Sequence, residues 1–162
     1  MSALTLFLAL VLAVSAGHKF ASPQRMAQAT ARLTGMPEAT ATAAAFAAAG
    51  LEGLAALALL LEPTRTGGAI AATALWCGYG ALLLGRRGQT LDCGCDLSQR
   101  AKRIGASAIC RPFFLAGLAL FALAAPVPFL WTVDAPFAAF ALLALWFASA
   151  ELGALPLNAR TR

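Results

Sequence analysis

The chain has 162 residues, of which 60% are hydrophobic and only 12% are charged. An ordinary soluble domain has about 25% charged residues, and at this size it buries only about 70% of its extended-chain surface. The composition therefore excludes a large soluble catalytic domain. It also excludes intrinsic disorder, which requires low hydrophobicity and high charge. The apolar residues are enough for four or five membrane spans of about 20 residues each.

The first expected element is a transmembrane helix at the N-terminus. Residues 1–17 form an almost uninterrupted apolar run, which His18 and Lys19 close. Residues 13–16 resemble the small-residue cleavage site of a signal peptide, but no basic residue precedes the apolar run. We therefore interpret this segment as a span.

Residues 21–37 are more polar than the run before them. Met26, Ala29 and Leu33 recur in this segment at helical spacing. This pattern predicts a short amphipathic helix on the membrane surface. A plain polar loop is the alternative interpretation.

The rest of the chain alternates between apolar and polar segments. We expect a second span at residues 40–61, a third at 69–85, a fourth from Pro112 to about Ala125, and a fifth from 135 to about 155. Residues 62–68 are expected to form a turn, and residues 86–111 the longest polar segment. Many Ala and Gly residues would let the helices pack closely in lipid. The sequence thus predicts an all-α, multi-pass transmembrane helical bundle that forms a single domain over residues 1–162.

The basic residues are divided unequally between the two ends of such a bundle. With five spans, eleven of the 12 Lys and Arg residues fall at one end and only Arg65 falls at the other. The positive-inside rule puts the crowded end in the cytoplasm. We therefore expect a bacterial inner-membrane protein with its N-terminus outside and with segment 86–111 and the C-terminus in the cytoplasm. The alternative is that segment 86–111 folds back into the bundle and reaches a redox partner within the membrane. The net charge of +5 then reflects topology, so membrane lipid is an expected partner and nucleic acid is not.

Cys93 and Cys95 flank a single glycine in the long polar segment. A disulfide between them would close a small strained ring, and strained disulfides tend to be labile and oxidising. Cys110 is the candidate resolving thiol. Alternatively, these Cys residues are inert structural thiols or ligands of a metal. A metal is disfavoured because the segment contains neither a Cys-x-x-Cys pair nor a histidine. We predict no metal and no cofactor.

Glu52 lies near the middle of the second expected span. A carboxyl group in a span is costly, so it is expected to face the bundle interior and to have a function. It is either a proton carrier or a structural hydrogen-bond partner between helices. Cys77, at a similar depth in the third span, is expected to be a small core residue, with a redox relay as the alternative. Lys19 is expected to pair with Glu151.

Three motifs resemble the methylamine-utilisation MauE family, which is related to the DoxX-like membrane bundles. They are His18–Phe20 at the end of the first span, Leu51–Leu54 in the second, and Asp92–Cys95 after the third. After the last motif this chain has Asp96-Leu97, where family members usually have Phe-Gly. The resemblance implies a role in disulfide formation in an exported enzyme, the small subunit of methylamine dehydrogenase. It also implies a thioredoxin-like partner that exchanges disulfides with Cys93 and Cys95.

The predicted function is therefore thiol–disulfide exchange in support of the maturation of an exported enzyme. The chain is a candidate thiol–disulfide oxidoreductase, and its candidate catalytic residues are Cys93, Cys95, Cys110 and Glu52. The main alternative is a non-catalytic membrane scaffold or stabilising subunit of a redox complex. A small transporter that uses Glu52 is a third hypothesis.

Overall fold

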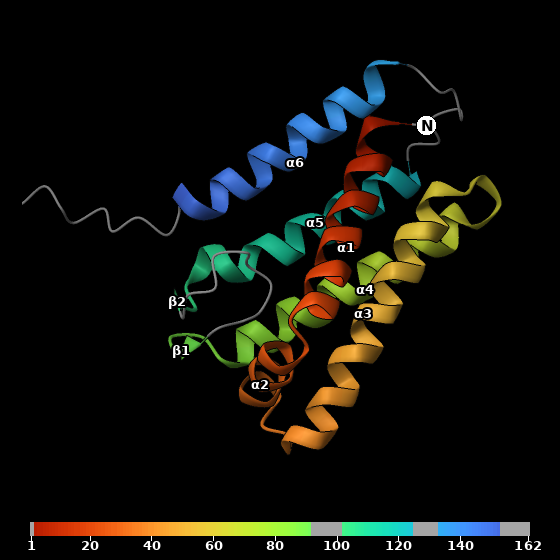
Figure 1. Cartoon of the computed structure of the whole chain (residues 1–162). Coiled ribbons are helices and arrows are strands. Elements are labelled where there is room, and N and C mark those ends of the chain that lie inside the picture. The colour runs from red at the N-terminus through yellow and green to blue at the C-terminus, as the bar shows by residue number, and fades with distance from the viewer. Residues whose placement is uncertain (1, 92–101, 125–132, 153–162) are drawn as a thin grey trace, which may run out of the picture.

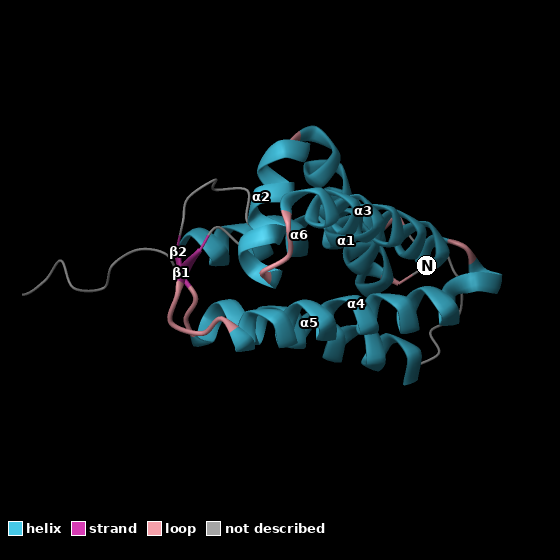
Figure 2. Ribbon diagram, turned by 90° about the horizontal axis from the view of Figure 1, so that it is seen from below, coloured by secondary structure: helices cyan, strands magenta, loops and turns pink. Residues whose placement is uncertain are grey.

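The computed structural model describes residues 2–91, 102–124 and 133–152. Helices make up nearly all of the described chain (Figure 2), which confirms the predicted helical membrane bundle. The helices are α1 (Ala3–Ala21), α2 (Pro23–Thr34), α3 (Glu38–Leu60), α4 (Arg65–Gly85), α5 (Ala106–Ala124) and α6 (Asp134–Leu152). A short 3-10 helix, η1 (Glu62–Thr64), joins α3 to α4. Two short strands, β1 (Thr90–Leu91) and β2 (Lys102–Arg103), form an antiparallel pair between α4 and α5.

Four of these helices are long and apolar enough to cross a membrane, namely α1, α3, α5, and α4 together with η1. Helix α6 is the fifth apolar helix, and its apolar part, Asp134–Ala150, is shorter. The sequence predicted five spans, and the structure has an apolar helix at each of the five expected places. Helix α2 lies at one end of the bundle, beside the two strands (Figure 1).

The main core lies where α1 packs between α3 and α6. Its largest apolar side chains with almost no exposed surface are Leu8, Leu12 and Leu59. Trp76 of α4 and Leu115 of α5 belong to the same cluster. Many of the remaining core residues are alanines, so the helix backbones approach closely, as expected where lipid provides little hydrophobic drive between helices.

Helix α2 confirms the predicted amphipathic helix and rules out the polar loop. Pro23 stands at its first turn, where a missing N–H costs no hydrogen bond. Gly35 ends the helix in a left-handed conformation with φ 79°. Met26 and Ala29 are buried, as their spacing predicted, and Leu33 packs against a second, smaller core.

The prediction of a turn over residues 62–68 is wrong in its second half. Helix α4 already begins at Arg65, so Gly67 and Gly68 lie inside its first turn. A Cβ atom on Gly68 would lie 2.7 Å from the backbone nitrogen of Leu59. The glycine therefore permits close approach of α4 to the end of α3, and it does not break the helix.

The fourth span also begins earlier than predicted. Helix α5 starts at Ala106, so Pro112 lies within the helix and does not open it. A proline inside a membrane helix is tolerated because neighbouring groups can satisfy the freed backbone carbonyl. The polar segment between α4 and α5 is shorter as a result, and Cys110 belongs to a helix.

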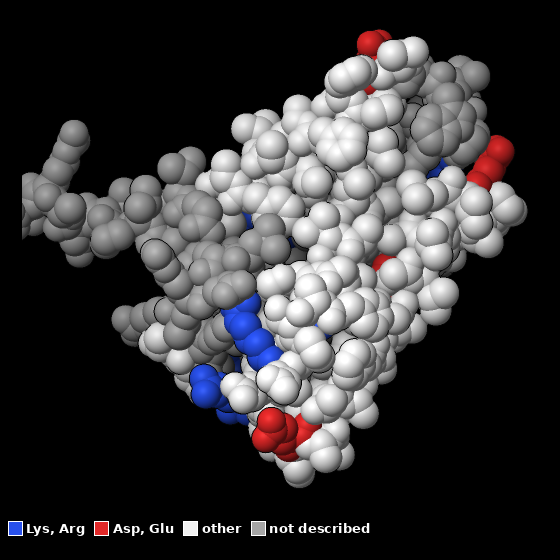
Figure 3. Space-filling view, viewed as in Figure 1, with Lys and Arg blue, Asp and Glu red and all other residues white. Residues whose placement is uncertain are grey.

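The predicted charge asymmetry is present among the described residues. Arg25, Arg86 and Arg87 lie at the end of the bundle that carries α2 and the strands, and Lys19 lies in the last turn of α1 toward the same end, whereas Arg65 lies at the opposite end. In Figure 3 the Lys and Arg side chains gather at the lower end of the view, where Figure 1 places α2. We call this the basic end.

Candidate functional site

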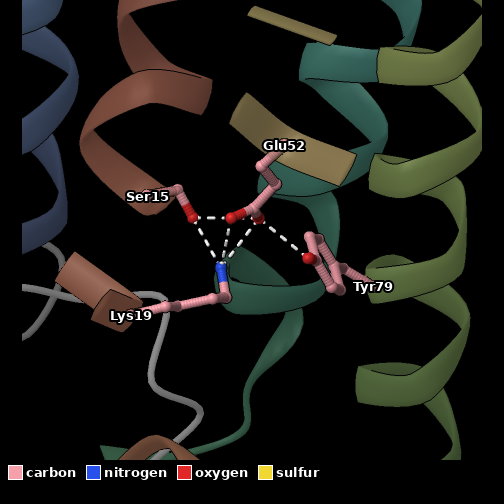
Figure 4. A network of polar contacts seen from close by, with 4 residues as sticks. All are labelled: Ser15, Lys19, Glu52 and Tyr79. Atoms are coloured by element: carbon pink, nitrogen blue, oxygen red, sulfur yellow. Dashed lines mark hydrogen bonds and ion pairs between the residues drawn. The ribbon is translucent and has the colours of Figure 1, made fainter. Parts of the chain in front are cut away.

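Four polar side chains converge inside the bundle (Figure 4). Glu52 reaches in from α3, Ser15 and Lys19 from α1, and Tyr79 from α4. The Lys19 Nζ donates to both carboxylate oxygens of Glu52, at 2.7 Å each. We call these four residues, Ser15, Lys19, Glu52 and Tyr79, the Glu52 cluster. Through the carboxylate of Glu52 they join three consecutive spans.

The Glu52 carboxylate has several further donors. Its Oε1 accepts from the Tyr79 hydroxyl at 2.8 Å and from the Ser15 hydroxyl at 3.0 Å. The Lys19 Nζ also donates to the Ser15 Oγ at 2.7 Å and lies 5.3 Å from the centroid of the Tyr79 ring. Such a position over an aromatic face is favourable for an ammonium group.

The carboxylate at the centre of the cluster is almost completely buried, and the three side chains around it are partly buried. Glu52 is 1% exposed and the Lys19 side chain 11%. An isolated charge would be very costly at such a place, and burial is tolerated only when the charge is paired and its remaining hydrogen-bonding capacity is used. The structure meets both conditions, so the cluster holds opposite charges and hydrogen bonds in one closed arrangement.

Two predictions concern residues of this cluster. Glu52 faces the bundle interior, as predicted. Lys19 pairs with Glu52, and the side chain of Glu151, its predicted partner, lies outside the described residues. The sequence analysis missed Ser15 and Tyr79. The sequence contains a signal for each of them. Ser15 lies four residues before Lys19 and therefore on the same helix face, and Tyr79 is the only tyrosine in the chain.

The two described cysteines are both free thiols. Cys77 in α4 is exposed on the outside of the bundle, so the expectation of a small core residue is wrong. It lies two residues from Tyr79, at a level close to that of the Glu52 cluster, as predicted. Cys110 is exposed in the second turn of α5, near the basic end.

Cys93 and Cys95 lie outside the described residues, in the segment between the two strands. The ends of that segment are described. Leu91, where the chain enters the segment, pairs with Lys102, where it leaves. Among the described residues, no three His, Cys, Asp or Glu side chains are grouped so that they could hold a metal ion.

These features define a class of protein. It is a helical membrane bundle with an ion pair enclosed by α1, α3 and α4 and with a short strand pair at its basic end. The chain matches the family model of the methylamine utilisation protein MauE over residues 1–125. It therefore belongs to the MauE family. The matched region contains the Glu52 cluster, the strand pair, all four cysteines and α5. No curated protein and no solved structure matches the chain.

Proposed function

We propose that the protein carries out thiol–disulfide exchange that supports the maturation of an exported enzyme. The observation that carries this proposal is the Cys-Gly-Cys motif at Cys93 and Cys95, which lies inside the region that matches the MauE family. The paired residues Leu91 and Lys102 bring the two ends of this motif's segment together at the basic end of the bundle. Two thiols one residue apart suit a reversible two-electron couple.

The exchange proceeds in two steps. A thiolate of the pair attacks one sulfur of a partner disulfide, forming a mixed disulfide and releasing one partner thiolate. The second thiol of the pair, as thiolate, then attacks the mixed disulfide and releases the other partner thiolate. The Cys93–Cys95 pair loses two electrons and two protons, and the partner gains both. The reverse sequence transfers a disulfide from the protein to its partner.

Cys110 is a further proposed resolving thiol, which would attack the mixed disulfide in place of the second thiol of the pair. It is exposed in α5, four residues after the start of the helix and eight residues after β2 begins. A thiol at this place could attack a mixed disulfide that involves Cys93 or Cys95. The partner that we propose is thioredoxin-like, and the proposed client is an exported enzyme such as the small subunit of methylamine dehydrogenase.

We further propose that the protein is a bacterial inner-membrane protein whose basic end faces the cytoplasm, as the positive-inside rule predicts. Cytosolic thiols are normally kept reduced, so a disulfide at Cys93 and Cys95 would be transient and catalytic. Because the proposed client is exported, exchange at this end would also require electrons to pass across the membrane or the pair to reach a redox partner within it. Glu52 is the proposed proton carrier. To carry a proton it would have to loosen its contact with Lys19, since the carboxylate has bonds to four donor hydrogens in the closed cluster.

A second candidate function is a non-catalytic membrane scaffold within a redox complex. The closed Glu52 cluster favours it, because a fully hydrogen-bonded ion pair that joins three spans is suited to fixing the arrangement of helices. In that case Cys93 and Cys95 would have only a local role.

The two candidates are separated by the Cys93→Ser/Cys95→Ser double variant. The full-length protein is produced with the small subunit of methylamine dehydrogenase, and the disulfides of that subunit are measured by alkylation of its free thiols. We expect at least a tenfold loss of correctly oxidised subunit, whereas the matched variant Cys77→Ser, at the outer face of α4, keeps the wild-type level. Wild-type maturation by the double variant would overturn the redox proposal and favour the scaffold.

A further inference from the structure

Arg86 stands where α4 ends and the strand pair begins. The neighbouring Arg87 is exposed, whereas Arg86 is half-buried against α2. The Arg86 Nε donates to the carbonyl oxygen of Leu33 at 2.9 Å. That carbonyl belongs to the last turn of α2, where backbone acceptors lack partners within the helix.

The guanidinium of Arg86 fits closely around the end of α2. A Cβ atom on Gly35, the left-handed residue that ends α2, would lie only 3.2 Å from the Arg86 Nη2. A cation at a helix C-terminus is also favoured by the helix dipole. Arg86 therefore fixes the C-terminus of α2 by a directed hydrogen bond, by charge and by close contact.

The backbone of Arg86 leads directly into the base of the strand pair. The Gln89 N–H donates to the carbonyl of Arg86 at 3.2 Å. Across the pair, the Gly88 N–H donates to the carbonyl of Ile104 at 2.9 Å, and the Ile104 N–H donates to the carbonyl of Gln89 at 2.8 Å. The two cross-strand bonds extend the ladder of β1 and β2 toward α4, and the Gln89–Arg86 bond is a turn that connects this ladder to the end of the helix.

A small apolar cluster supports the same junction. Leu83 of α4, Ile104 after β2 and Ile109 of α5 are buried together, and Leu33 of α2 packs against them. The cluster joins α2, α4, the base of the strand pair and α5. Arg86 lies at its polar edge, because it follows Leu83 by three residues and contacts the carbonyl of Leu33.

We propose that Arg86 is a positioning residue that couples α2 to the base of the strand pair, and through it to the thiols of Cys93 and Cys95. This inference rests on the proposed thiol function for its consequence, but the coupling itself is a property of the described residues. Loss of the Arg86–Leu33 bond frees α2 from the strand base. The equilibrium between the dithiol and disulfide forms of Cys93 and Cys95 then shifts.

The test uses the full-length protein in lipid nanodiscs and three variants, Arg86→Gln, Arg86→Lys and Arg87→Gln. The first readout is backbone hydrogen exchange in the last turn of α2 and at Gly88 and Ile104. We expect Arg86→Gln to raise exchange at both places at least fivefold. Arg86→Lys, which keeps a cation at the helix end, should recover part of the protection. Arg87→Gln, which removes the same charge one residue on, should leave exchange within twofold of wild type.

The second readout is the equilibrium between dithiol and disulfide in reduced and oxidised glutathione buffers. In this reaction oxidised glutathione gains two electrons and two protons, and the pair loses them. Trypsin cleaves after Arg87, or after Arg86 in the Arg87→Gln variant, and after Arg100. One peptide therefore carries both Cys93 and Cys95, and mass spectrometry gives its oxidised fraction. We expect Arg86→Gln to change the equilibrium constant at least threefold, and Arg87→Gln to leave it unchanged.

Equal effects of Arg86→Gln and Arg87→Gln in either readout would overturn the inference, since the cause would then be charge alone. No change in hydrogen exchange with Arg86→Gln would overturn it as well. The proposed function fails separately, if the Cys93→Ser/Cys95→Ser protein still supports maturation of the client. A thermal unfolding curve for each variant shows whether Arg86→Gln acts locally, as the inference requires, or unfolds the whole bundle, which would contradict it.

Discussion

The Glu52 cluster and the basic end of the bundle use charge in opposite ways. In the cluster, Lys19 and Glu52 are buried and directly paired, and each carboxylate oxygen has a donor. At the basic end, Arg87 is exposed, and Arg86 is partly buried against a helix carbonyl. The few charges in the apolar interior therefore hold helices together, whereas the proposed thiol chemistry lies at the polar end.

The largest expected effect comes from removing one partner of the buried pair. Lys19→Ala leaves the Glu52 carboxylate buried with only the Ser15 and Tyr79 hydroxyls as donors. Breaking a buried ion pair in this way costs about 3–5 kcal/mol. We expect a correspondingly large loss of stability, measured by unfolding of the purified protein in detergent micelles.

The control for this prediction is the double variant Lys19→Met/Glu52→Leu. Replacement of both charges by apolar side chains of similar size is often neutral or stabilising, so most of the lost stability should return. If Lys19→Ala unfolds at the wild-type midpoint, the pair is not the structural link that the distances indicate. A double variant that is less stable than Lys19→Ala would equally contradict this structural role.

A smaller effect is expected from Ile104→Ala at the basic end. Ile104 is 3% exposed, and truncation of a buried isoleucine costs about 2–5 kcal/mol. We expect a value near the lower limit because the cluster around it is small. Hydrogen exchange at Gly88 should rise before the spans open. The matched control is Ile70→Ala in α4, where the side chain is 55% exposed. An equal loss with both variants would contradict a distinct core at this end.

The next effect is that of Tyr79→Phe in the Glu52 cluster. The substitution removes the hydroxyl that donates to Glu52 and keeps the ring that lies beside Lys19. A hydrogen bond to a charged group contributes about 1.5–3 kcal/mol, and we expect the lower value because Lys19 and Ser15 still donate. The unfolding midpoint in denaturant reports the change. A loss as large as that of Lys19→Ala would mean that Tyr79, and not Lys19, is the main partner of Glu52.

The smallest effect is expected in α4, which contributes to both regions. A Cβ atom on Gly80 would lie 2.7 Å from the Phe113 ring of α5, so Gly80→Ala should lose about 1 kcal/mol or more through overpacking. Gly78→Ala meets open space and should gain up to about 1 kcal/mol from helix propensity. Opposite signs in thermal unfolding are the expected result. Equal signs would contradict the close contact between α4 and α5.

Much of the fold could be predicted because membrane spans depend on composition and length. The apolar runs predicted the five apolar helices, and the spacing of Met26 and Ala29 predicted the buried face of α2. Helix ends were harder to predict. Gly68 and Pro112 are commonly found at turns and helix starts, yet here Gly68 serves close packing and Pro112 lies within a helix.

The candidate site was predictable only in part, because it depends on how the helices are rotated relative to one another. The burial of Glu52 followed from the cost of a charge in lipid. Its pairing with Lys19 did not, since many arrangements of spans would have put Lys19 beside another acid. The outward position of Cys77 depends on the same rotation of α4 that turns Tyr79 toward Glu52.

We propose that Cys93 and Cys95 form a redox couple at the basic end of this MauE-family bundle. The most direct test is to trap the thiols of living cells with an alkylating agent and to measure the tryptic peptide of residues 88–100. We expect an unalkylated disulfide form that disappears after a brief treatment with reductant and returns when the reductant is removed. A peptide that carries two alkyl groups under all of these conditions would contradict it.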